Sequence, residues 1–318
     1  MDGRSIRWGI LSTARINRLV LEGARDAAGV EITAVASRDR ERARAYAREH
    51  RIPRAHGSYE ELLADEGVDA VYISLPNSLH HPWTMRALAA GKHVLCEKPY
   101  SRRAADVVEA FDAANASGLV LSEAFMWRHS LQTRKLVELL SEIGELQTVR
   151  ATFAFRLDDV TNVRMLPELD GGALMDVGCY CVSGARLLAG EPDRVYGEQV
   201  VGPSGVDVRF TGVLRFSSGV VAELTSSFTF AHQSLEAIGT RGTISLADPW
   251  HAHESVLVLN GKAIHAEGAN AYRRELQDVA AAIRGEAPPL LGRDDALGQA
   301  RAIEALYASA AGGTSIEL

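Results

Sequence analysis

An acid, an amine and a proline directly follow a short apolar run in the sequence HVLCEKPY. These are Glu97, Lys98 and Pro99, and residues 93–96 before them form a predicted buried strand. A lysine at the tip of a strand is more often solvated than reactive. At the carboxyl edge of a parallel sheet, however, its ammonium can reach a ligand held in the crevice there. Lys98 is therefore the first candidate for chemistry, with Glu97 beside it.

A second candidate is the turn GILSTA, between a predicted first strand (6–11) and a predicted helix (14–27). Such a turn brings backbone N–H groups and a helix N-terminus up to a pyrophosphate. Only one residue of the turn is glycine, so the turn alone fits either a dinucleotide site or a plain structural turn. Its place in a βαβ unit that opens the chain favours the dinucleotide. The residues expected to contact the cofactor here are Gly9, Ser12, Thr13, Ala14, Arg15 and Ile16.

The end of the second predicted strand (31–37) indicates which dinucleotide is bound. An acid there would bond the ribose 2′-hydroxyl, but the chain has Ser37 and Arg38, with Arg42 one helical turn further on. Two guanidiniums and a hydroxyl suit a 2′-phosphate, so NADP is favoured over NAD. The alternative is a solvated helix start, since Asp39 and Glu41 lie among these residues.

The ends of the later strands face the same crevice if the sheet is parallel. The run SLPNSLHH follows the strand predicted at 70–75, and CEKP follows the next one. They add to the expected cofactor contacts Leu75, Pro76, Asn77, His80, Glu97 and Lys98.

The rhythm of the chain changes near residue 124. Up to that point strands and helices alternate, which predicts a mostly parallel sheet with helices on both faces. Beyond it, residues 148–157 alternate apolar and polar side chains, and similar runs recur at 205–216, 219–230, 234–239, 241–246 and 254–259. We expect an α/β protein with domains at 1–124 and 125–318. The second domain carries an open, mostly antiparallel sheet with helices at 130–142, 173–189, 271–284 and 294–311, and the C-terminal helix can pack back on the first domain.

Composition excludes several classes of function. The formal net charge of −7 leaves no basic surplus for binding nucleic-acid phosphates. No apolar run is long enough to span a bilayer, and three scattered cysteines are typical of a reducing compartment. We therefore expect a cytoplasmic protein without nucleic-acid or membrane partners. The histidines His80, His81 and His129 show neither an i, i+4 pair nor an acid cluster, so no metal site is expected.

The motifs GKHVLCEKP (91–99) and GGALMDVGCYCV (171–182) resemble those of the Gfo/Idh/MocA family, which is named after glucose–fructose oxidoreductase, inositol dehydrogenase and MocA. The resemblance covers essentially the whole chain. It implies an N-terminal Rossmann domain, a C-terminal domain on an open antiparallel sheet, and an active-site Lys98, often before a cis proline. GILSTARI, SRD and EAFMWR resemble the subgroup of dimeric dihydrodiol dehydrogenase, NADP-dependent D-xylose dehydrogenase and glucose–fructose oxidoreductase. Many relatives carry glycine where this chain has Ser12.

The resemblance further implies that Asp176 and Tyr180 are catalytic, although many relatives carry histidine at the second position. The two residues are four positions apart on a predicted helix and so share one face. A free tyrosine has a pKa of about 10, and a nearby ammonium lowers it. We expect Tyr180 to be the acid or base and Lys98 its electrostatic partner. Asp176 would orient a substrate hydroxyl or keep Lys98 charged.

The substrate pocket is predicted less sharply. Residues expected to contact substrate are Trp127, Phe155, Asp159 and Asn162, and Arg128 is expected at the cofactor or a substrate oxygen. The alternative assigns Phe155 to the sheet core and residues 157–172 to a surface loop. The expected activity is NADP-dependent oxidation of an aldose at C1. Alternatives are trans-dihydrodiol oxidation and a non-catalytic NADP-binding sensor. If Leu224, Phe228 and Phe230 lie on the open face of the sheet, a homodimer through that face is expected.

Overall fold

The chain divides into two compact units. The computed structural model describes residues 5–251, 253 and 255–318. The first unit comprises residues up to 101 together with 105–126 and 270–296, and the second comprises 102–104, 127–269 and 297–318. The chain thus crosses into the second unit close to the boundary expected after residue 124, and segment 270–296 belongs to the first unit.

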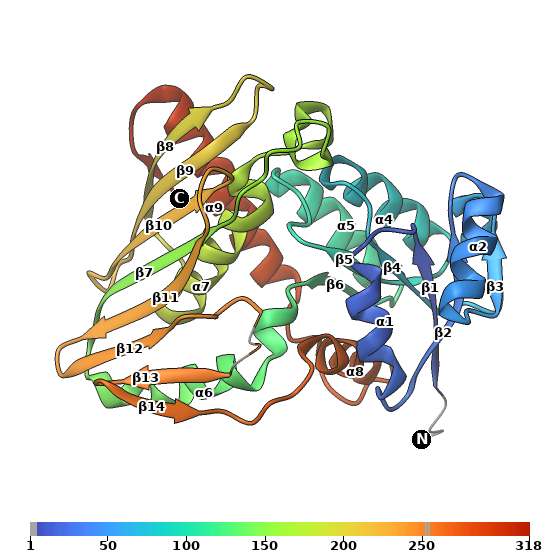
Figure 1. Ribbon diagram of the computed structural model, residues 1–318, viewed down its shortest axis with the longest axis horizontal. Coiled ribbons are helices and arrows are strands. Elements are labelled where there is room, and N and C mark those ends of the chain that lie inside the picture. The colour runs from blue at the N-terminus through green and yellow to red at the C-terminus, as the bar shows by residue number, and fades with distance from the viewer. Residues whose placement is uncertain (1–4, 252, 254) are drawn as a thin grey trace. The chain divides into compact units, whose positions relative to one another are not determined.

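A six-stranded parallel sheet forms the centre of the first unit (Figure 1). The strand order is β3-β2-β1-β4-β5-β6. Successive strands are added on one side of β1 up to β3 and on its other side from β4 onward. Ligands of such sheets bind at the carboxyl ends of the strands beside this switch point, between β1 and β4. The strands are β1 Ile6–Leu11, β2 Val30–Ala36, β3 Arg54–His56, β4 Ala70–Ile73, β5 His93–Glu97 and β6 Leu121–Ala124.

Helices pack on this sheet, and side-chain caps mark the starts of two of them. Asp39 accepts hydrogen bonds at the start of α2, and Ser58 does so at the start of α3. Helix α8 belongs to this unit, where Leu276 packs in the core with Trp8 of β1. The helices are α1 Asn17–Arg25, α2 Arg40–His50, α3 Tyr59–Leu63, α4 His80–Ala89, α5 Ala104–Ala116 and α8 Ala271–Ile283.

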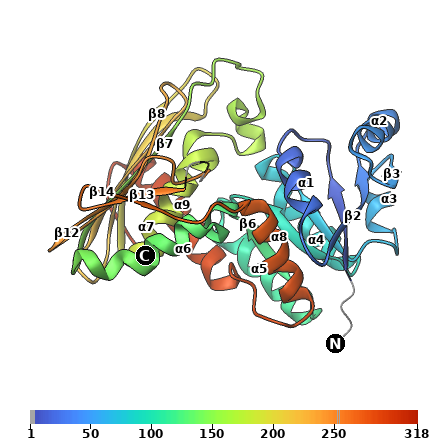
Figure 2. The same cartoon turned by 60° about the horizontal axis from the view of Figure 1, so that its bottom comes forward.

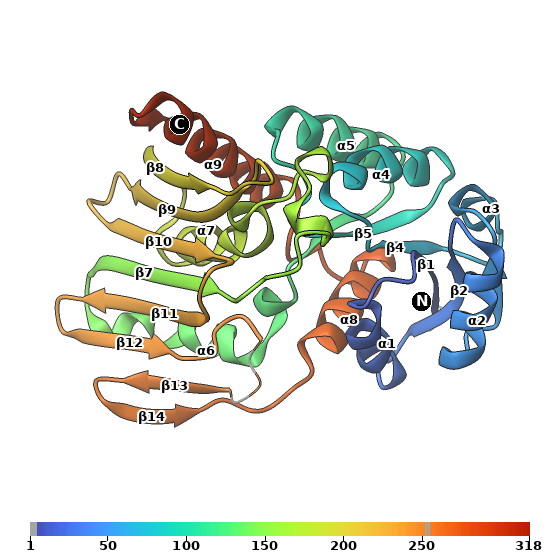
Figure 3. The same cartoon turned by 45° about the horizontal axis from the view of Figure 1, so that its top comes forward.

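The second unit is built on a nine-stranded sheet in the order β14-β13-β12-β11-β7-β10-β9-β8-β15 (Figure 3). The β7–β10 pair is parallel and the other pairs are antiparallel, so the sheet is mixed. The strands are β7 Leu146–Ala154, β8 Arg194–Val201, β9 Asp207–Arg215, β10 Val221–Ser227, β11 His232–Gly239, β12 Gly242–Leu246, β13 Val256–Leu259, β14 Lys262–His265 and β15 Ile316–Glu317.

The helices of the second unit lie on one face of this sheet (Figure 2): α6 Leu131–Leu139, α7 Cys179–Ala189 and α9 Arg293–Gly312. The other face carries charged pairs beside exposed apolar side chains such as Val213. Arg150 of β7 lies there and pairs with Glu223 of β10 at 3.1 Å and Glu236 of β11 at 3.7 Å. The expectation that Leu224 and Phe228 lie on the open face is therefore wrong, whereas Phe230 is 38% exposed. Leu224 and Phe228 are buried, because the alternation of β10 turns Ala222, Leu224 and Ser226 toward the helices.

Further differences concern the ends of elements. Helix α1 begins three residues later than predicted, since residues 13–16 form the preceding turn, and β7 ends at Ala154 rather than at residue 157. Strands β3, β8, β14 and β15 were not predicted; β14 and β15 are the short edge strands of their sheet. Within the described residues, none of the helices is long and apolar enough to cross a membrane.

Candidate active site

Ser12 shapes the turn after β1. Its φ of 143° lies in the region that favours glycine. The hydroxyl oxygen lies 2.8 Å from Ser74 Oγ and 3.1 Å from Ser74 O, and it accepts the N–H of Ala14 at 3.0 Å. These bonds offset the backbone strain and fix the turn to the end of β4.

The turn leaves hydrogen-bond donors available at the start of α1. Among the described residues, the N–H groups of Thr13, Arg15 and Ile16 make no hydrogen bond, and Ile16 begins the helix without a side-chain cap. Such donors suit a pyrophosphate. Gly9 lies within β1, where an added Cβ would come 2.7 Å from Leu62 of α3, and its cofactor contact stays a prediction.

Two cations stand at the end of β2. Burial raises the pKa of Tyr59, and the charges of Arg38 and Arg42 oppose this shift, which places both guanidiniums near one hydroxyl. The neighbouring acid, Asp39, accepts the N–H groups of Glu41 at 2.9 Å and Arg42 at 3.1 Å. Because its carboxylate caps α2, the acid nearest the predicted ribose position is already engaged. This arrangement fits a 2′-phosphate.

His80 joins the two loops that follow β4 and β5. The buried ring has Nε2 2.8 Å from Leu75 O and Nδ1 2.9 Å from Pro99 O. Both ring nitrogens are thus engaged, and a direct hydrogen bond to a cofactor would need one of these bonds to break. Burial lowers the pKa of His80, and the nearby charge of Lys98 lowers it further, although the two carbonyls oppose this.

The Lys98–Pro99 peptide bond is cis. Glu97 sits beneath it: one carboxylate oxygen accepts the N–H of Lys98 at 3.2 Å and the other accepts the hydroxyl of Tyr72. Glu275 of α8 is fully buried nearby, and burial together with the charge of Glu97 raises its pKa. Hydrogen bonds of Glu97 with the Lys98 N–H and the Tyr72 hydroxyl therefore fix the strand tip that carries Lys98.

In the second unit, Asp176 lies on a π-helical turn, Leu174–Gly178, that leads into α7. Its Oδ2 accepts a bond from Arg164 Nε at 2.7 Å. Asn162 Oδ1 in turn accepts the backbone N–H of Arg164 at 3.1 Å and its Nη1 at 3.4 Å. Asn162 therefore positions Arg164, which fixes one oxygen of Asp176. π-Turns of this kind occur often at functional sites.

Two glycines and a buried acid hold the start of this turn. An added Cβ on Gly171 would lie 2.4 Å from Arg164 O, so glycine allows the two backbone segments to approach closely. Gly172 has φ +124° and faces Asp207. Asp207 accepts the N–H of Leu174 at 2.7 Å and the hydroxyl of Tyr307 at 2.8 Å. Burial raises the pKa of Asp207 to about 6. Neither Asp207 nor Tyr307 was predicted, because both contacts join distant segments.

Tyr180 stands in the first turn of α7 beside a group of aromatic rings. Its ring meets Phe153 edge-on at 5.3 Å and Trp250 at 5.9 Å, tilted by 57°. Trp127 is fully buried and meets Trp250 edge-on at 5.2 Å. The predicted wall residue thus packs behind this group, and substrate contact stays a prediction for it.

The other predicted pocket residues have local partners. Phe155 packs edge-on against Phe228 at 5.3 Å, with Arg164 6.0 Å from its ring centre. Asp159 accepts the N–H and hydroxyl of Thr161 and so orders the loop. Arg128 Nη1 lies 3.4 Å from Ser183 Oγ, which ties it to α7. Phe155 therefore lies near Arg164, the partner of Asp176, and the substrate contacts of Phe155, Asp159, Asn162 and Arg128 remain predictions.

Comparison with known proteins agrees with both units. Residues 6–125 match an oxidoreductase family with an NAD-binding Rossmann fold, and residues 131–245 match the Gfo/Idh/MocA C-terminal domain. The chain is 41% identical to an NADP-dependent D-xylose 1-dehydrogenase of Haloferax volcanii, over 98% of this chain and 99% of that protein.

Solved structures agree over nearly the full length. The aldose–aldose oxidoreductase of Caulobacter crescentus, solved with glycerol, has a TM-score of 0.93 and 27% identity over 99% of this chain and all of that one. A 3-ketoreductase from Actinomadura kijaniata, solved with NADP, has a TM-score of 0.91 and 28% identity over 96% and 98% of the two chains. Structures of that reductase include variants with a tyrosine replaced by phenylalanine and a lysine replaced by alanine. This chain belongs to the Gfo/Idh/MocA family of oxidoreductases.

Proposed function

We propose that the protein is an NADP-dependent oxidoreductase that transfers a hydride between C1 of an aldose, or a carbon of a related cyclic diol, and the nicotinamide. One observation carries the proposal: a single chain combines a nucleotide turn with open N–H donors and a helix that bears Asp176 and Tyr180 on adjacent turns. The NADP-dependent D-xylose dehydrogenase and the aldose oxidoreductase among its relatives support the substrate class.

The cofactor would be held by groups that the first unit already presents. The N–H groups of Thr13, Arg15 and Ile16 suit the pyrophosphate, and Arg38 and Arg42 suit the 2′-phosphate. When bound, NADP supplies the hydride acceptor for oxidation or the hydride for reduction.

Tyr180, Lys98 and Asp176 would divide the proton chemistry. In oxidation, the phenolate of Tyr180 takes the proton of the substrate hydroxyl while the carbon loses hydride; in reduction, the phenol returns that proton to the carbonyl oxygen. The ammonium of Lys98 favours the phenolate and stabilises the developing alkoxide. Asp176 accepts a substrate hydroxyl, and Arg164, bonded to its Oδ2, keeps its carboxylate in one orientation.

The test combines a substrate panel with matched variants. Aldoses, polyols and a trans-dihydrodiol are offered with NADP and with NAD, and NADPH formation from xylose or glucose is expected. Tyr180→Phe and Lys98→Met are expected to lower turnover by about 100-fold or more, with NADP affinity nearly unchanged. The half-buried Tyr196 and the exposed Lys262 give the controls Tyr196→Phe and Lys262→Met, which should keep full turnover.

Two outcomes would contradict the proposal. Near-normal turnover in Tyr180→Phe or Lys98→Met, with intact NADP binding, would remove the assigned roles. Tight NADP binding without turnover of any compound in the panel would favour the sensor, the second candidate function.

We also propose that two copies associate through the open face of the second unit's sheet. The polar groups around Arg150 support a contact that depends on charge pairing.

A further inference from the structure

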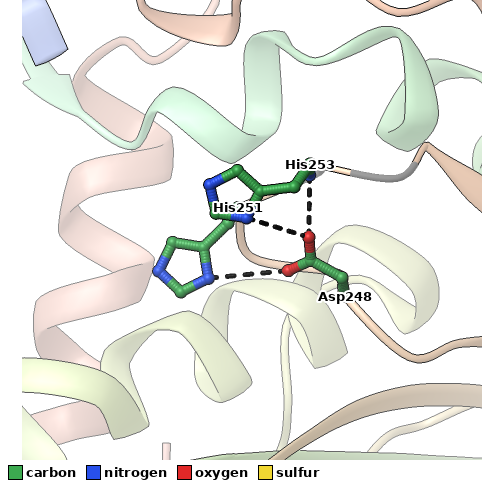
Figure 4. A group of neighbouring side chains, drawn as sticks. All are labelled: Asp248, His251 and His253. Carbon is green, nitrogen blue, oxygen red and sulfur yellow. Dashed lines mark hydrogen bonds and ion pairs between the residues drawn. The ribbon is translucent and has the colours of Figure 1, made fainter.

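The loop between β12 and β13 gathers three metal-ligating side chains that the proposed chemistry does not use (Figure 4). These are Asp248, His251 and His253. One ligand atom from each lies within 4.8 Å of the others. Sequence spacing did not predict this cluster, because only the turn of the loop brings the two imidazoles to one carboxylate.

The two separations between an imidazole nitrogen and a carboxylate oxygen are close to those of a metal site. His251 Nδ1 lies 3.5 Å from Asp248 Oδ1, and His253 Nδ1 lies 3.3 Å from Asp248 Oδ2. A tetrahedral zinc ion with bonds of about 2.0–2.1 Å would hold its ligand atoms about 3.3–3.4 Å apart. A small adjustment of the side chains would therefore place one cation between the three groups.

The carboxylate is held in place and keeps one oxygen for a ligand. Asp248 Oδ2 accepts the backbone N–H of His253 at 2.7 Å, and the backbone O of Asp248 accepts a bond from Gln132 of α6 at 2.9 Å. Asp248 Oδ1 is buried and has no hydrogen-bond partner among the described residues. The imidazole of His251, 3.5 Å away, makes no hydrogen bond to this buried oxygen, and a cation would offset the cost of its burial.

The donor set indicates which cations fit. Two imidazoles and one carboxylate suit zinc, cobalt, nickel or copper, whereas magnesium and calcium prefer oxygen ligands only. We propose that Asp248, His251 and His253 bind one zinc-type divalent cation, with water in the remaining positions. The His253 side chain is 77% exposed and is the ligand with most freedom to turn toward the ion.

The site adjoins the aromatic group around Tyr180 but is separate from it. His251 meets Phe153 edge-on at 5.4 Å, and Phe153 meets Tyr180 at 5.3 Å. One ring thus separates the cluster from the proposed acid or base. Binding of the cation can be measured without sugar or NADP, so its test stands apart from that of the proposed function.

The experiment titrates Co²⁺ into the full chain, prepared without a polyhistidine tag, and follows visible absorption and calorimetric heat. One equivalent of Co²⁺ is expected to bind saturably and to be displaced by Zn²⁺ but not by Mg²⁺. His253→Ala and Asp248→Asn are expected to raise the Kd for Co²⁺ by at least about 10-fold, the scale on which site changes weaken metal binding. The exposed histidine of β14 gives the control His265→Ala, which should bind as the parent does.

Two results would overturn the proposal. The first is the absence of saturable Co²⁺ binding in the parent chain, which would assign the three side chains to ion pairs between protonated imidazoles and the carboxylate. The second is equal Kd values in His253→Ala and the parent, which would place the bound ion elsewhere. Metal-free Tm values of both variants, measured alongside, distinguish lost binding from lost folding.

Discussion

At the residue scale, Arg38 and Arg42 are the side chains that should decide between the two nicotinamide cofactors. Each would make charge-assisted bonds to a 2′-phosphate, which NAD lacks. Arg38→Ala and Arg42→Ala are expected to raise the Kd for NADP roughly 10- to 100-fold, as loss of a bond to a charged group costs about 1.5–3 kcal/mol. The Kd for NAD should change little.

Fluorescence titration of both cofactors measures this selectivity. Arg44, on the same helix and paired with Glu41 at 2.7 Å, gives the control Arg44→Ala, for which both affinities should match the parent. Equal losses of NADP and NAD affinity in Arg38→Ala would show that its side chain supports the fold of the turn rather than the phosphate.

Some features of single residues could be predicted from the sequence, and others depend on partners that are distant along the chain. The types and spacing of Glu97, Lys98 and Pro99 indicated their place at a strand end, and the structure confirms it. The structure of the turn at Ser12 was harder to predict, because a serine with φ 143° depends on bonds to Ser74, 62 positions away. The partners of Asp176 and His80 likewise come from segments that only folding brings together.

At the element scale, long amphipathic patterns were the most predictable feature. Helix α2 spans the predicted residues 40–50. Asp39 caps its first turn, and its buried residues Ala43 and Ala47 recur at helical spacing. The π-turn before α7 was missed, since one extra residue per turn barely changes the apolar pattern. Strand β8 was missed as well: Glu198, Val200 and Val201 are exposed, and alternation of buried side chains ends halfway along it.

The start of the π-turn depends on a buried carboxyl whose protonation should affect stability. The pKa of Asp207 rises from 3.8 to about 6 in the folded protein because the group is buried. A raised pKa means that the folded state binds the proton more tightly, so this stabilisation is complete below about pH 4 and is lost as the pH rises through 6. A shift of about two pKa units corresponds to at most about 3 kcal/mol.

Urea unfolding of the parent and of Asp207→Asn at pH 4 and pH 7.5 measures this contribution. Asparagine does not titrate, and other groups titrate alike in both proteins. The free energy of unfolding of the parent, relative to that of the variant, is therefore expected to fall by up to about 3 kcal/mol between the two pH values. A pH-independent difference would mean that Asp207 stays ionised when buried.

At the scale of the whole molecule, the charged pairs on the open face of the second unit's sheet lead to a particular kind of assembly. Among the charged side chains on this face, Arg150 is 56% exposed and lies between Glu223 and Glu236 on neighbouring strands. An interface built on such pairs gains its specificity from electrostatic complementarity rather than from apolar area. We therefore expect a homodimer that weakens with salt.

Sedimentation equilibrium at low salt and at 1 M NaCl, where the screening length is about 3 Å, measures this dependence. Arg150→Glu is expected to raise the dimer Kd by about 10-fold or more, because it leaves like charges facing one another. The exposed Arg134 of α6, on the helical side of the sheet, gives the control Arg134→Glu, which should dimerise normally. A dimer insensitive to both salt and Arg150→Glu would have to use another surface, since no arrangement that buries Arg150 between two copies could tolerate the reversed charge.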